Sequence, residues 1–253
     1  MTASLVCAQS KNSKNANTIV IVHGAWSSAA DWDTVAAKLK ADGNEVIAVN
    51  LAGHGTDKTP VSAINLQGYV DSVKKAVGTR TNIILVGHSF GGIVISQTAE
   101  QIPNQIKLLV YVAAYVPKNG ESLLSIANTD ADSHIPKYLR IDEKAGIADI
   151  NRDGLVDVFV DDAPKAVQDF FVTNFKAEPL APLATPVTLT AANFSKVGKV
   201  YVHSFNDHVI GYPLQQRMVK DAGIVRFYGL PSSHTPFISF PNIIASIISN
   251  EAK

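Results

Sequence analysis

The amino-acid sequence predicts an α/β fold in which a mostly parallel central sheet is flanked by helices on both faces. Short apolar runs rich in β-branched residues alternate with segments of helical spacing along most of the 253 residues. Strands buried on both faces give such continuous apolar runs, and a helix usually connects two parallel strands. A hydrophobic content of 46% with 17% charged residues is typical of a globular protein with a large core.

The first half of the chain shows this alternation most clearly. Each expected strand is an apolar run that ends at a polar or small residue, and each expected helix has apolar residues three or four positions apart. The predicted elements are strand 19–22, helix 31–41, strand 45–49, helix 66–77, strand 82–86, helix 91–101 and strand 107–114.

The second half returns to the pattern with strand 199–205, helix 214–221, strand 224–228 and helix 242–250. The intervening stretch carries more charge and several prolines. Because open α/β sheets bind ligands beyond the carboxyl ends of their strands, we interpret this stretch as a cap, or lid, that walls a pocket. The predicted organisation is an N-terminal segment 1–16, a first core part 17–116, the cap insertion 117–186 and a second core part 187–253.

Charge and cysteine content bound the possible partners. The 22 Lys and Arg residues balance 22 Asp and Glu residues, so no basic footprint for nucleic acid or an anionic membrane is visible. No stretch approaches the roughly 20 apolar residues of a membrane span, and we expect a soluble monomer or homodimer. The single cysteine, Cys7, excludes an intramolecular disulfide and lies in a segment expected to be poorly ordered.

The first eight residues leave the compartment open. Val6-Cys7-Ala8 resembles a signal-peptidase site, but a positively charged start and a full apolar stretch are missing. Residues 1–8 are either a clipped export signal, which implies a periplasmic or secreted protein, or an ordinary terminus of a cytoplasmic one.

A G-x-S-x-G pentapeptide, Gly87-His88-Ser89-Phe90-Gly91, follows the predicted strand 82–86 directly. This pattern is typical of a nucleophile elbow, in which a sharp turn from strand to helix presents the serine. Glycines on either side allow the strand and the helix to approach closely. Ser89 is therefore the candidate nucleophile, and a glycine-rich turn with an incidental serine is the alternative.

A serine nucleophile needs a base and an acid that orients the base. In folds with this elbow the order along the chain is nucleophile, acid, histidine, each in a loop after a strand. Asp207 and His234 occupy such loops after the last two predicted strands. The rival acids are Asp161 and Asp162 in the insertion and Asp221 on a helix.

Two backbone amides are candidates for stabilising the negative oxygen of a tetrahedral intermediate. The N–H of Phe90 follows the nucleophile, and the N–H of Ala25 lies in the loop after the first core strand. Trp26, Tyr115 and Phe159 are candidate pocket residues, although each is also a typical core residue. We expect His134 on the surface.

One segment of the insertion resembles part of a calcium loop. Asp149-Ile150-Asn151-Arg152-Asp153-Gly154-Leu155-Val156-Asp157 matches a D-x-N-x-D-G pattern, but Val160 stands where the bidentate acid of an EF-hand belongs. We favour a tight polar turn between two short strands over a calcium site.

Together these residues resemble the α/β-hydrolase superfamily, within it the branch of plant methyl esterases, hydroxynitrile lyases and bacterial esterase relatives. The resemblance implies an α/β-hydrolase fold with Ser89, Asp207 and His234 as the triad and Ala25 and Phe90 as oxyanion donors. The motifs that carry it are 20–26, 50–55, 86–92, 113–117, 185–187, 200–202, Asp207 and His234.

The resemblance further implies a serine carboxylesterase without metal or cofactor that hydrolyses small to medium carboxylic esters through an acyl-enzyme. Hydroxynitrile lyases of this branch have a lysine after the catalytic histidine and a threonine in the oxyanion loop, where this chain has Thr235 and Gly24. A neutral threonine supplies no positive charge for cyanide, which disfavours a lyase. A small-molecule receptor without turnover is the remaining alternative.

Overall fold

The computed structural model describes residues 17–253. The segment 1–16, with Cys7 and the possible export-signal remnant, lies outside the described residues. No helix within residues 17–253 is both long and apolar enough to span a bilayer.

A six-stranded sheet with the order β2-β1-β3-β4-β8-β9 forms the centre of the molecule. All neighbouring strands in this sheet are parallel, so all of their carboxyl ends meet at one edge. The strands are β1 (Thr18–Val22), β2 (Glu45–Val49), β3 (Ile83–Ser89), β4 (Ile106–Ala114), β8 (Gly198–Ser204) and β9 (Phe227–Leu230).

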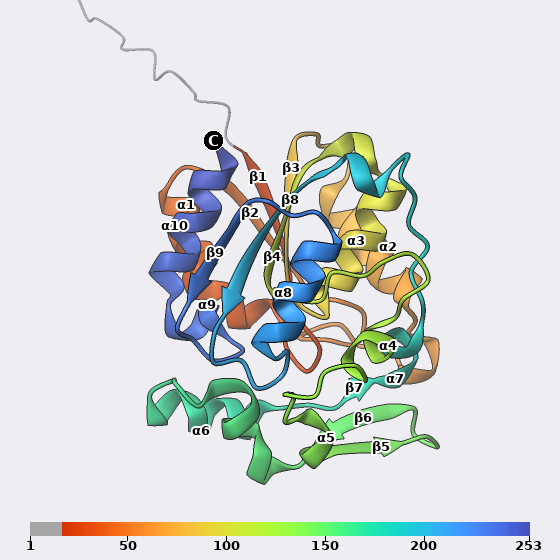
Figure 1. Ribbon diagram of the computed structural model, residues 1–253, viewed down its shortest axis with the longest axis vertical. Helices are drawn as coiled ribbons and strands as arrows, with labels where there is room; N and C mark the ends of the chain where they lie inside the picture. Colours follow the sequence, from red (N-terminus) through yellow and green to blue (C-terminus); the bar gives the residue numbers. More distant parts are fainter. Residues whose placement is uncertain (1–16) are drawn as a thin grey trace, which may run out of the picture.

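Helices cover both faces of the sheet, as Figure 1 shows. On one face α1 (Asp33–Ala41) packs beside α10 (Pro241–Ala252), and on the other lie α2 (Leu66–Val77), α3 (Gly91–Gln101) and α8 (Tyr212–Asp221). This arrangement confirms the predicted fold class.

Alternation along the strands divides the interior into two hydrophobic cores. In β1, Ile19 and Ile21 join the core under α1 and α10, whereas Val20 and Val22 join the core under α2, α3 and α8. All four side chains are at most 1% exposed. Because successive residues of a strand point to opposite faces, a continuous apolar run serves both cores at once.

The bounds of α2 agree with the prediction, and the local sequence explains both ends. The side chain of Asn65 accepts a hydrogen bond of 2.9 Å from the N–H of Gly68, which caps the first turn. At the other end Gly78 has a φ of 58°, a left-handed conformation that stops the helix.

Two predicted elements are wrong in detail. The helix predicted over 31–41 is a 3-10 turn, Ala29–Trp32, followed by α1. The strand predicted over 224–228 lies at Phe227–Leu230. Ile224 instead packs in the core after the end of α8, and Val225 is 89% exposed. β9 is one of the two edge strands of its sheet, and three of its four residues are exposed, so burial does not mark its bounds in the sequence.

The segment 117–186, which we call the cap segment, forms a separate layer beyond the carboxyl ends of the strands, drawn in green in Figure 1. It contains a three-stranded antiparallel sheet, β5-β6-β7, and short helices. Its elements are α4 (Leu123–Ala127), α5 (Ile135–Tyr138), β5 (Leu139–Asp142), β6 (Ile147–Ile150), a π-helix (Val156–Val160), α6 (Lys165–Asn174), β7 (Glu178–Pro179) and α7 (Leu180–Ala184).

Candidate active site

Ser89 is the last residue of β3 and has a φ of 51°. A non-glycine residue rarely adopts this left-handed conformation, which marks a strained turn. The flanking glycines are needed for close packing: a Cβ on Gly87 would lie 2.7 Å from the carbonyl oxygen of Gly91, and a Cβ on Gly91 would lie 2.5 Å from that of Val22. The backbone therefore has the sharp strand-to-helix turn that the pentapeptide predicts.

Asp207 and His234, 27 residues apart in sequence, meet at the same edge of the sheet. His234 Nδ1 lies 2.9 and 3.0 Å from the two carboxylate oxygens of Asp207. Both side chains are almost fully buried. A ring that donates its Nδ1 proton to a carboxylate keeps Nε2 free to accept a proton.

The Asp207 carboxylate is held by further donors. Its Oδ1 accepts hydrogen bonds from the backbone N–H groups of Val209 and Ile210, at 2.8 and 2.9 Å. Gln215, a fully buried residue of α8, donates to Oδ2 at 3.3 Å and to the carbonyl oxygens of Ser204 and Ile210. Gln215 was not among the predicted site residues, and its spacing on a helix after the acid loop is its only sequence signal.

The loop that carries His234 is fixed from two sides. On the core side, Nε2 of His88 donates to the carbonyl oxygen of His234 at 2.9 Å. On the cap side, the carbonyl oxygen of Phe159 accepts from the hydroxyls of Ser233 and Thr235 at 3.1 and 2.9 Å. The residue before and the residue after the imidazole are thus both bonded to the cap segment.

Ser89 lies beside this pair without a hydrogen bond to it. Within residues 17–253, no hydrogen bond joins the Ser89 hydroxyl to His234. His88, the neighbour of Ser89, has its ring centroid 4.6 Å from that of His234. Trp26 lines both the cavity that Ser89 borders and the small hollow that His234 borders. Catalytic hydrogen bonds are often long in a free enzyme and shorten when substrate binds.

The two predicted oxyanion donors lie in loops beside Ser89. Phe90 precedes α3, so its N–H stands at the positive end of that helix. Ala25 follows β1, and a Cβ on the preceding Gly24 would lie only 2.8 Å from Cβ of Ser89. Within the described residues, neither the Ala25 nor the Phe90 N–H donates a hydrogen bond to the protein. Both amides are therefore available to a ligand.

Glu178, a fully buried carboxylate of the cap strand β7, was also not among the predicted site residues. It accepts hydrogen bonds from the N–H of Trp26 at 2.8 Å, from Nε2 of His54 at 2.8 Å and from the hydroxyl of Tyr69 at 3.0 Å. Trp26 has a φ of 60°, so this carboxylate stabilises a strained residue next to Ala25. Nothing in the local sequence at 178 predicts these partners.

Buried histidines around the site have shifted pKa values. Burial, aided by the charge of His54, lowers the pKa of His23 to about 3. Burial likewise holds the pKa of His88 well below its usual value. Burial also acts to lower the pKa of His54, but the hydrogen bond and the negative charge of Glu178 outweigh it, and the pKa is raised.

A cavity of about 230 Å³ extends from Ser89 into the cap segment. Trp26 and Tyr115, two of the predicted pocket residues, line it together with apolar side chains such as Leu124 and Leu183. Phe159 is buried and borders the hollow beside His234 instead, with its ring centroid 5.9 Å from the imidazole. The space next to the serine is mainly apolar and suits an uncharged group.

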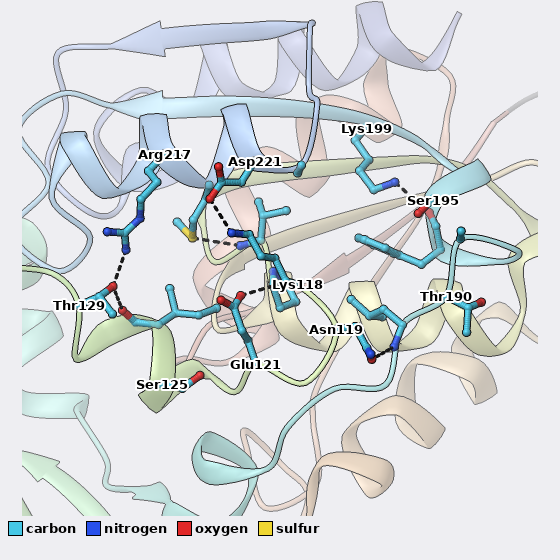
Figure 2. Close-up of a pocket in the computed structure, with 18 residues that line it drawn as sticks. Lys118, Asn119, Glu121, Ser125, Thr129, Thr190, Ser195, Lys199, Arg217 and Asp221 are labelled. Carbon is cyan, nitrogen blue, oxygen red and sulfur yellow. Dashed lines mark hydrogen bonds and ion pairs between the residues drawn. The ribbon is translucent and has the colours of Figure 1, made fainter.

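A larger cavity of about 570 Å³ lies away from these residues, between α8 and the start of the cap segment (Figure 2). Its charged groups have partners in the protein: Lys118 pairs with Asp221 at 2.8 Å, and Lys199 donates to two backbone carbonyl oxygens. Burial lowers the pKa of Lys199 to about 8. The cavity contains none of the predicted site residues.

The rival acids have other contacts. Asp221 forms the ion pair with Lys118, and Asp162 accepts from the N–H of Ser233 and from the hydroxyl of Ser239. Asp161 makes no hydrogen bond to His234 within the described residues. Only Asp207, among these four carboxylates, contacts the imidazole.

The segment Asp149–Asp157 is not the turn between two strands that we favoured. It runs from the end of β6 through a 3-10 turn into the π-helix, and the hairpin turn of this sheet lies earlier, at 143–146. Asp149 bonds Arg152 at 3.1 Å, while Asp157 faces two histidines, so these carboxylates do not converge as calcium ligands would.

Two named relatives match most of this chain. The chain is 29% identical over 252 residues to a putative chloroplastic methylesterase 11 of Arabidopsis thaliana, covering 94% of this chain and 64% of that protein's length. It is also 29% identical to a pyrethroid hydrolase of Sphingobium wenxiniae, covering 92% and 87%.

Solved structures show the same likeness. An extracellular alpha/beta-hydrolase from a Paenibacillus species superposes with a TM-score of 0.80 at 27% identity, covering 92% of this chain and 98% of that one. The model of the "Alpha/beta hydrolase family" matches residues 19–247, nearly the whole chain. The chain therefore belongs to the alpha/beta hydrolase family.

Proposed function

We propose that the protein is a serine carboxylesterase that hydrolyses small to medium carboxylic esters through an acyl-enzyme. Ser89 is the nucleophile, His234 the general base and Asp207 the acid that orients the base. The observation that carries the proposal is the buried pair of Asp207 and His234 at the edge of the sheet where the strained Ser89 ends β3.

The reaction follows from the chemistry of these groups. The Ser89 hydroxyl attacks the ester carbonyl carbon while His234 Nε2 takes its proton, and the imidazolium then protonates the leaving alkoxide. Water attacks the acyl-enzyme by the same route and releases the carboxylic acid. Asp207 stabilises the imidazolium and holds the ring with Nδ1 toward the carboxylate.

The amides of Ala25 and Phe90 stabilise the negative oxygen that forms in each step. Removing one donor of this kind typically costs about 3 to 4 kcal/mol of barrier. Glu178 supports this function indirectly, because it bonds the N–H of Trp26 and so holds the backbone next to Ala25. It is a positioning residue.

The substrate class follows from the cavity and from the relatives. A mainly apolar space of about 230 Å³ beside Ser89 fits an uncharged acyl or alcohol group and has no cationic side chain in its lining. The relatives carry the names methylesterase and pyrethroid hydrolase, and the substrates that those names imply are carboxylic esters.

Two features weigh against a hydroxynitrile lyase. Position 235 is a threonine whose hydroxyl donates to the carbonyl oxygen of Phe159, so no positive charge stands next to His234. A side chain at position 24 would press against Ser89, since even a Cβ there would lie 2.8 Å from Cβ of the serine. The threonine of the lyases therefore does not fit this loop.

The test combines active-site labelling with an ester panel. A serine-directed phosphonate should add one adduct per chain, at Ser89, by mass spectrometry, and labelling should fail in Ser89→Ala. A panel of p-nitrophenyl and alkyl esters, varied separately in acyl and alcohol length, should then show the turnover. Labelling at Ser89 without hydrolysis of any ester would mean a receptor, and labelling elsewhere would refute the assignment of the nucleophile.

A further inference from the structure

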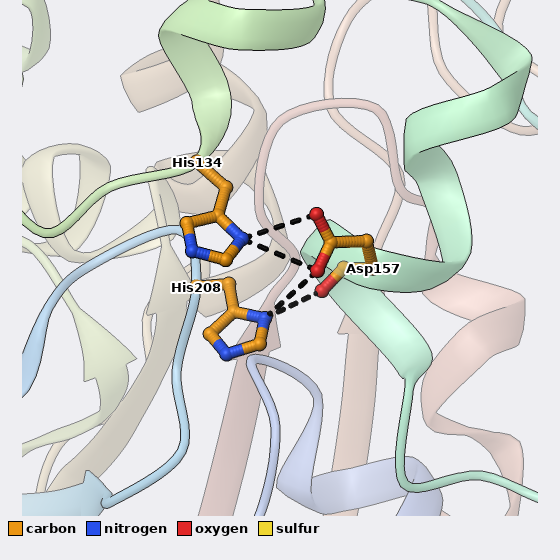
Figure 3. A group of neighbouring side chains, drawn as sticks. All are labelled: His134, Asp157 and His208. Carbon is orange, nitrogen blue, oxygen red and sulfur yellow. Dashed lines mark hydrogen bonds and ion pairs between the residues drawn. The ribbon is translucent and has the colours of Figure 1, made fainter.

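Three side chains outside the candidate active site converge where the cap segment meets the core: His134, Asp157 and His208 (Figure 3). Their ligating atoms all lie within 4.8 Å of one another. His134 precedes α5, Asp157 belongs to the π-helix, and His208 follows Asp207 in the loop after β8. The proposed esterase reaction uses none of the three.

The rings are arranged as a pair rather than scattered on the surface. The imidazoles of His134 and His208 stack with centroids 4.1 Å apart, and both present Nδ1 to Asp157. The backbone N–H of His134 donates to the carbonyl oxygen of His208 at 2.8 Å, which fixes the relative position of the two residues. The segment of His134 in the cap and the loop of His208 in the core thus place both Nδ1 atoms on the side that faces Asp157.

We propose that His134, Asp157 and His208 bind a divalent transition-metal ion such as Zn²⁺. Two imidazole nitrogens and one carboxylate are a common ligand set for zinc and its neighbours, whereas Ca²⁺ and Mg²⁺ prefer oxygen ligands only. The fourth position would be taken by water, because each of the three side chains is about one third or more exposed.

The distances agree with such a site. Around a tetrahedral zinc ion with bonds of about 2.0 to 2.1 Å, neighbouring ligand atoms lie about 3.3 Å apart. Nδ1 of His134 lies 3.2 Å from Oδ1 of Asp157, and Nδ1 of His208 lies 3.3 Å from the same oxygen. Both nitrogen atoms therefore already lie near the spacing from the carboxylate that the ion requires, and all three ligating atoms lie within 4.8 Å of one another.

Metal binding changes the protonation of the rings. Nδ1 of His208 donates to the backbone carbonyl oxygen of Asp157 at 2.8 Å. A neutral ring that ligates through Nδ1 carries its proton on Nε2, so the Nδ1 proton is exchanged through solvent and this hydrogen bond is replaced by the metal–nitrogen bond. The bound ion would then link α5, the π-helix and the loop of Asp207.

The test is a calorimetric titration of the chelator-treated full chain with ZnCl₂, alongside MgCl₂ and CaCl₂. We expect binding of one Zn²⁺ per chain, no comparable response to Mg²⁺ or Ca²⁺, and a Zn²⁺-dependent rise in the unfolding midpoint. His134→Ala, His208→Ala and Asp157→Asn should each weaken Zn²⁺ binding by at least about tenfold.

Two controls separate this site from others. Asp169→Asn removes an exposed carboxylate of α6 in the same cap segment and should leave binding unchanged. His234→Ala should also retain it, which would show that the ion is not captured by the active-site imidazole. A wild-type chain that binds no Zn²⁺, or binding that survives all three ligand substitutions, would overturn the proposal. The wild-type result decides the first case even if a variant fails to fold.

Discussion

The core and the cap segment are built differently, yet both reach the candidate active site. The core has a parallel sheet whose central strands β1 and β3 are buried along their full length, while the exposed strand β5 and the exposed Phe170 lie in the cap segment. The core supplies the side chains with proposed chemical roles. The cap supplies partners for the loops that carry them.

Glu178 and Phe159 show what this difference means. Glu178 bonds the loop of Ala25 through Trp26, and the carbonyl oxygen of Phe159 bonds the residues on either side of His234. The cap segment therefore does more than wall a pocket. It also holds the oxyanion loop and the histidine loop in position through these contacts. The core alone does not provide them.

The largest effect on activity is expected at a core residue that has a chemical role and contributes little to stability. Ser89→Ala should lower kcat on the order of a million-fold, because it removes the nucleophile. Its thermal midpoint should stay within about a degree or two of the wild type or rise, since strain at a left-handed residue is not increased by alanine. Steady-state kinetics and calorimetry measure both. Ser195→Ala, at an exposed site, is the control, and substantial residual hydrolysis by Ser89→Ala would move the nucleophile elsewhere.

Asp207→Asn should lower kcat by about ten-thousand-fold. The amide can hold the ring only in the wrong tautomer, and it does not stabilise the imidazolium. The backbone donors of Val209 and Ile210 still find an acceptor oxygen, so the fold should persist. Asp71→Asn on the exposed face of α2 is the control in the same kinetic assay. An active Asp207→Asn would transfer the acid role to another carboxylate.

A cap residue should affect both activity and stability. Glu178→Ala leaves His54, Tyr69 and the N–H of Trp26 without their acceptor, and loss of one member of a buried pair costs about 3 kcal/mol or more. A displaced oxyanion loop should reduce kcat by about a hundredfold. Urea unfolding and ester kinetics measure these losses.

Glu178→Gln sharpens this test because it keeps one acceptor oxygen, so it should lose less activity than Glu178→Ala. Glu143→Gln, an exposed position of the cap segment, should match the wild type. If Glu178→Ala lowers the free energy of unfolding but leaves kcat unchanged, the cap segment contributes to folding alone. The two regions then differ in that only the core affects activity.

The smallest expected effect is the pH dependence of the free energy of unfolding. The pKa of His23 is lowered in the folded state, so the unfolded chain binds the extra proton, and the free energy of unfolding should fall as pH drops below about 6.5. His54 has the opposite sign. Its raised pKa means that its contribution is complete below about pH 6.5 and is lost as pH rises through the folded value.

Urea unfolding from about pH 5 to about pH 8 separates the two histidines. The stability difference between wild type and Glu178→Gln should shrink as pH rises, because only the wild type favours protonated His54. A difference that is constant over this range would contradict a charged His54 paired with Glu178.

Whether a structural feature can be predicted from the sequence depends on how far apart along the chain the interacting residues lie. The bounds of α2 follow from a capping asparagine, a helical apolar pattern and a terminal glycine, all within the segment. Ser89, Asp207 and His234 could be chosen because an elbow motif and loops after apolar strands are local signals. β9 was misplaced because three of its four residues are exposed, so burial does not mark its bounds in the sequence.

Glu178 and Gln215 could not be predicted in this way. Each is a polar residue that reads as exposed, and its burial depends on donors or acceptors brought close only by the complete fold. The same holds for His134, expected on the surface: it is partly exposed, but its neighbours His208 and Asp157 come from other segments. A single sequence contains the residues of such clusters without indicating that they meet.

The bonds of Glu178 also constrain the order in which the chain folds. Its three donors lie 152, 124 and 109 residues earlier in the sequence. Contacts across such separations form late, after the loop-closure entropy has been offset by other structure. During synthesis the loop of Ala25 emerges long before its acceptor does. The oxyanion loop thus matures only when β7 docks, so a nascent chain that ends before residue 178 cannot yet have a finished catalytic centre.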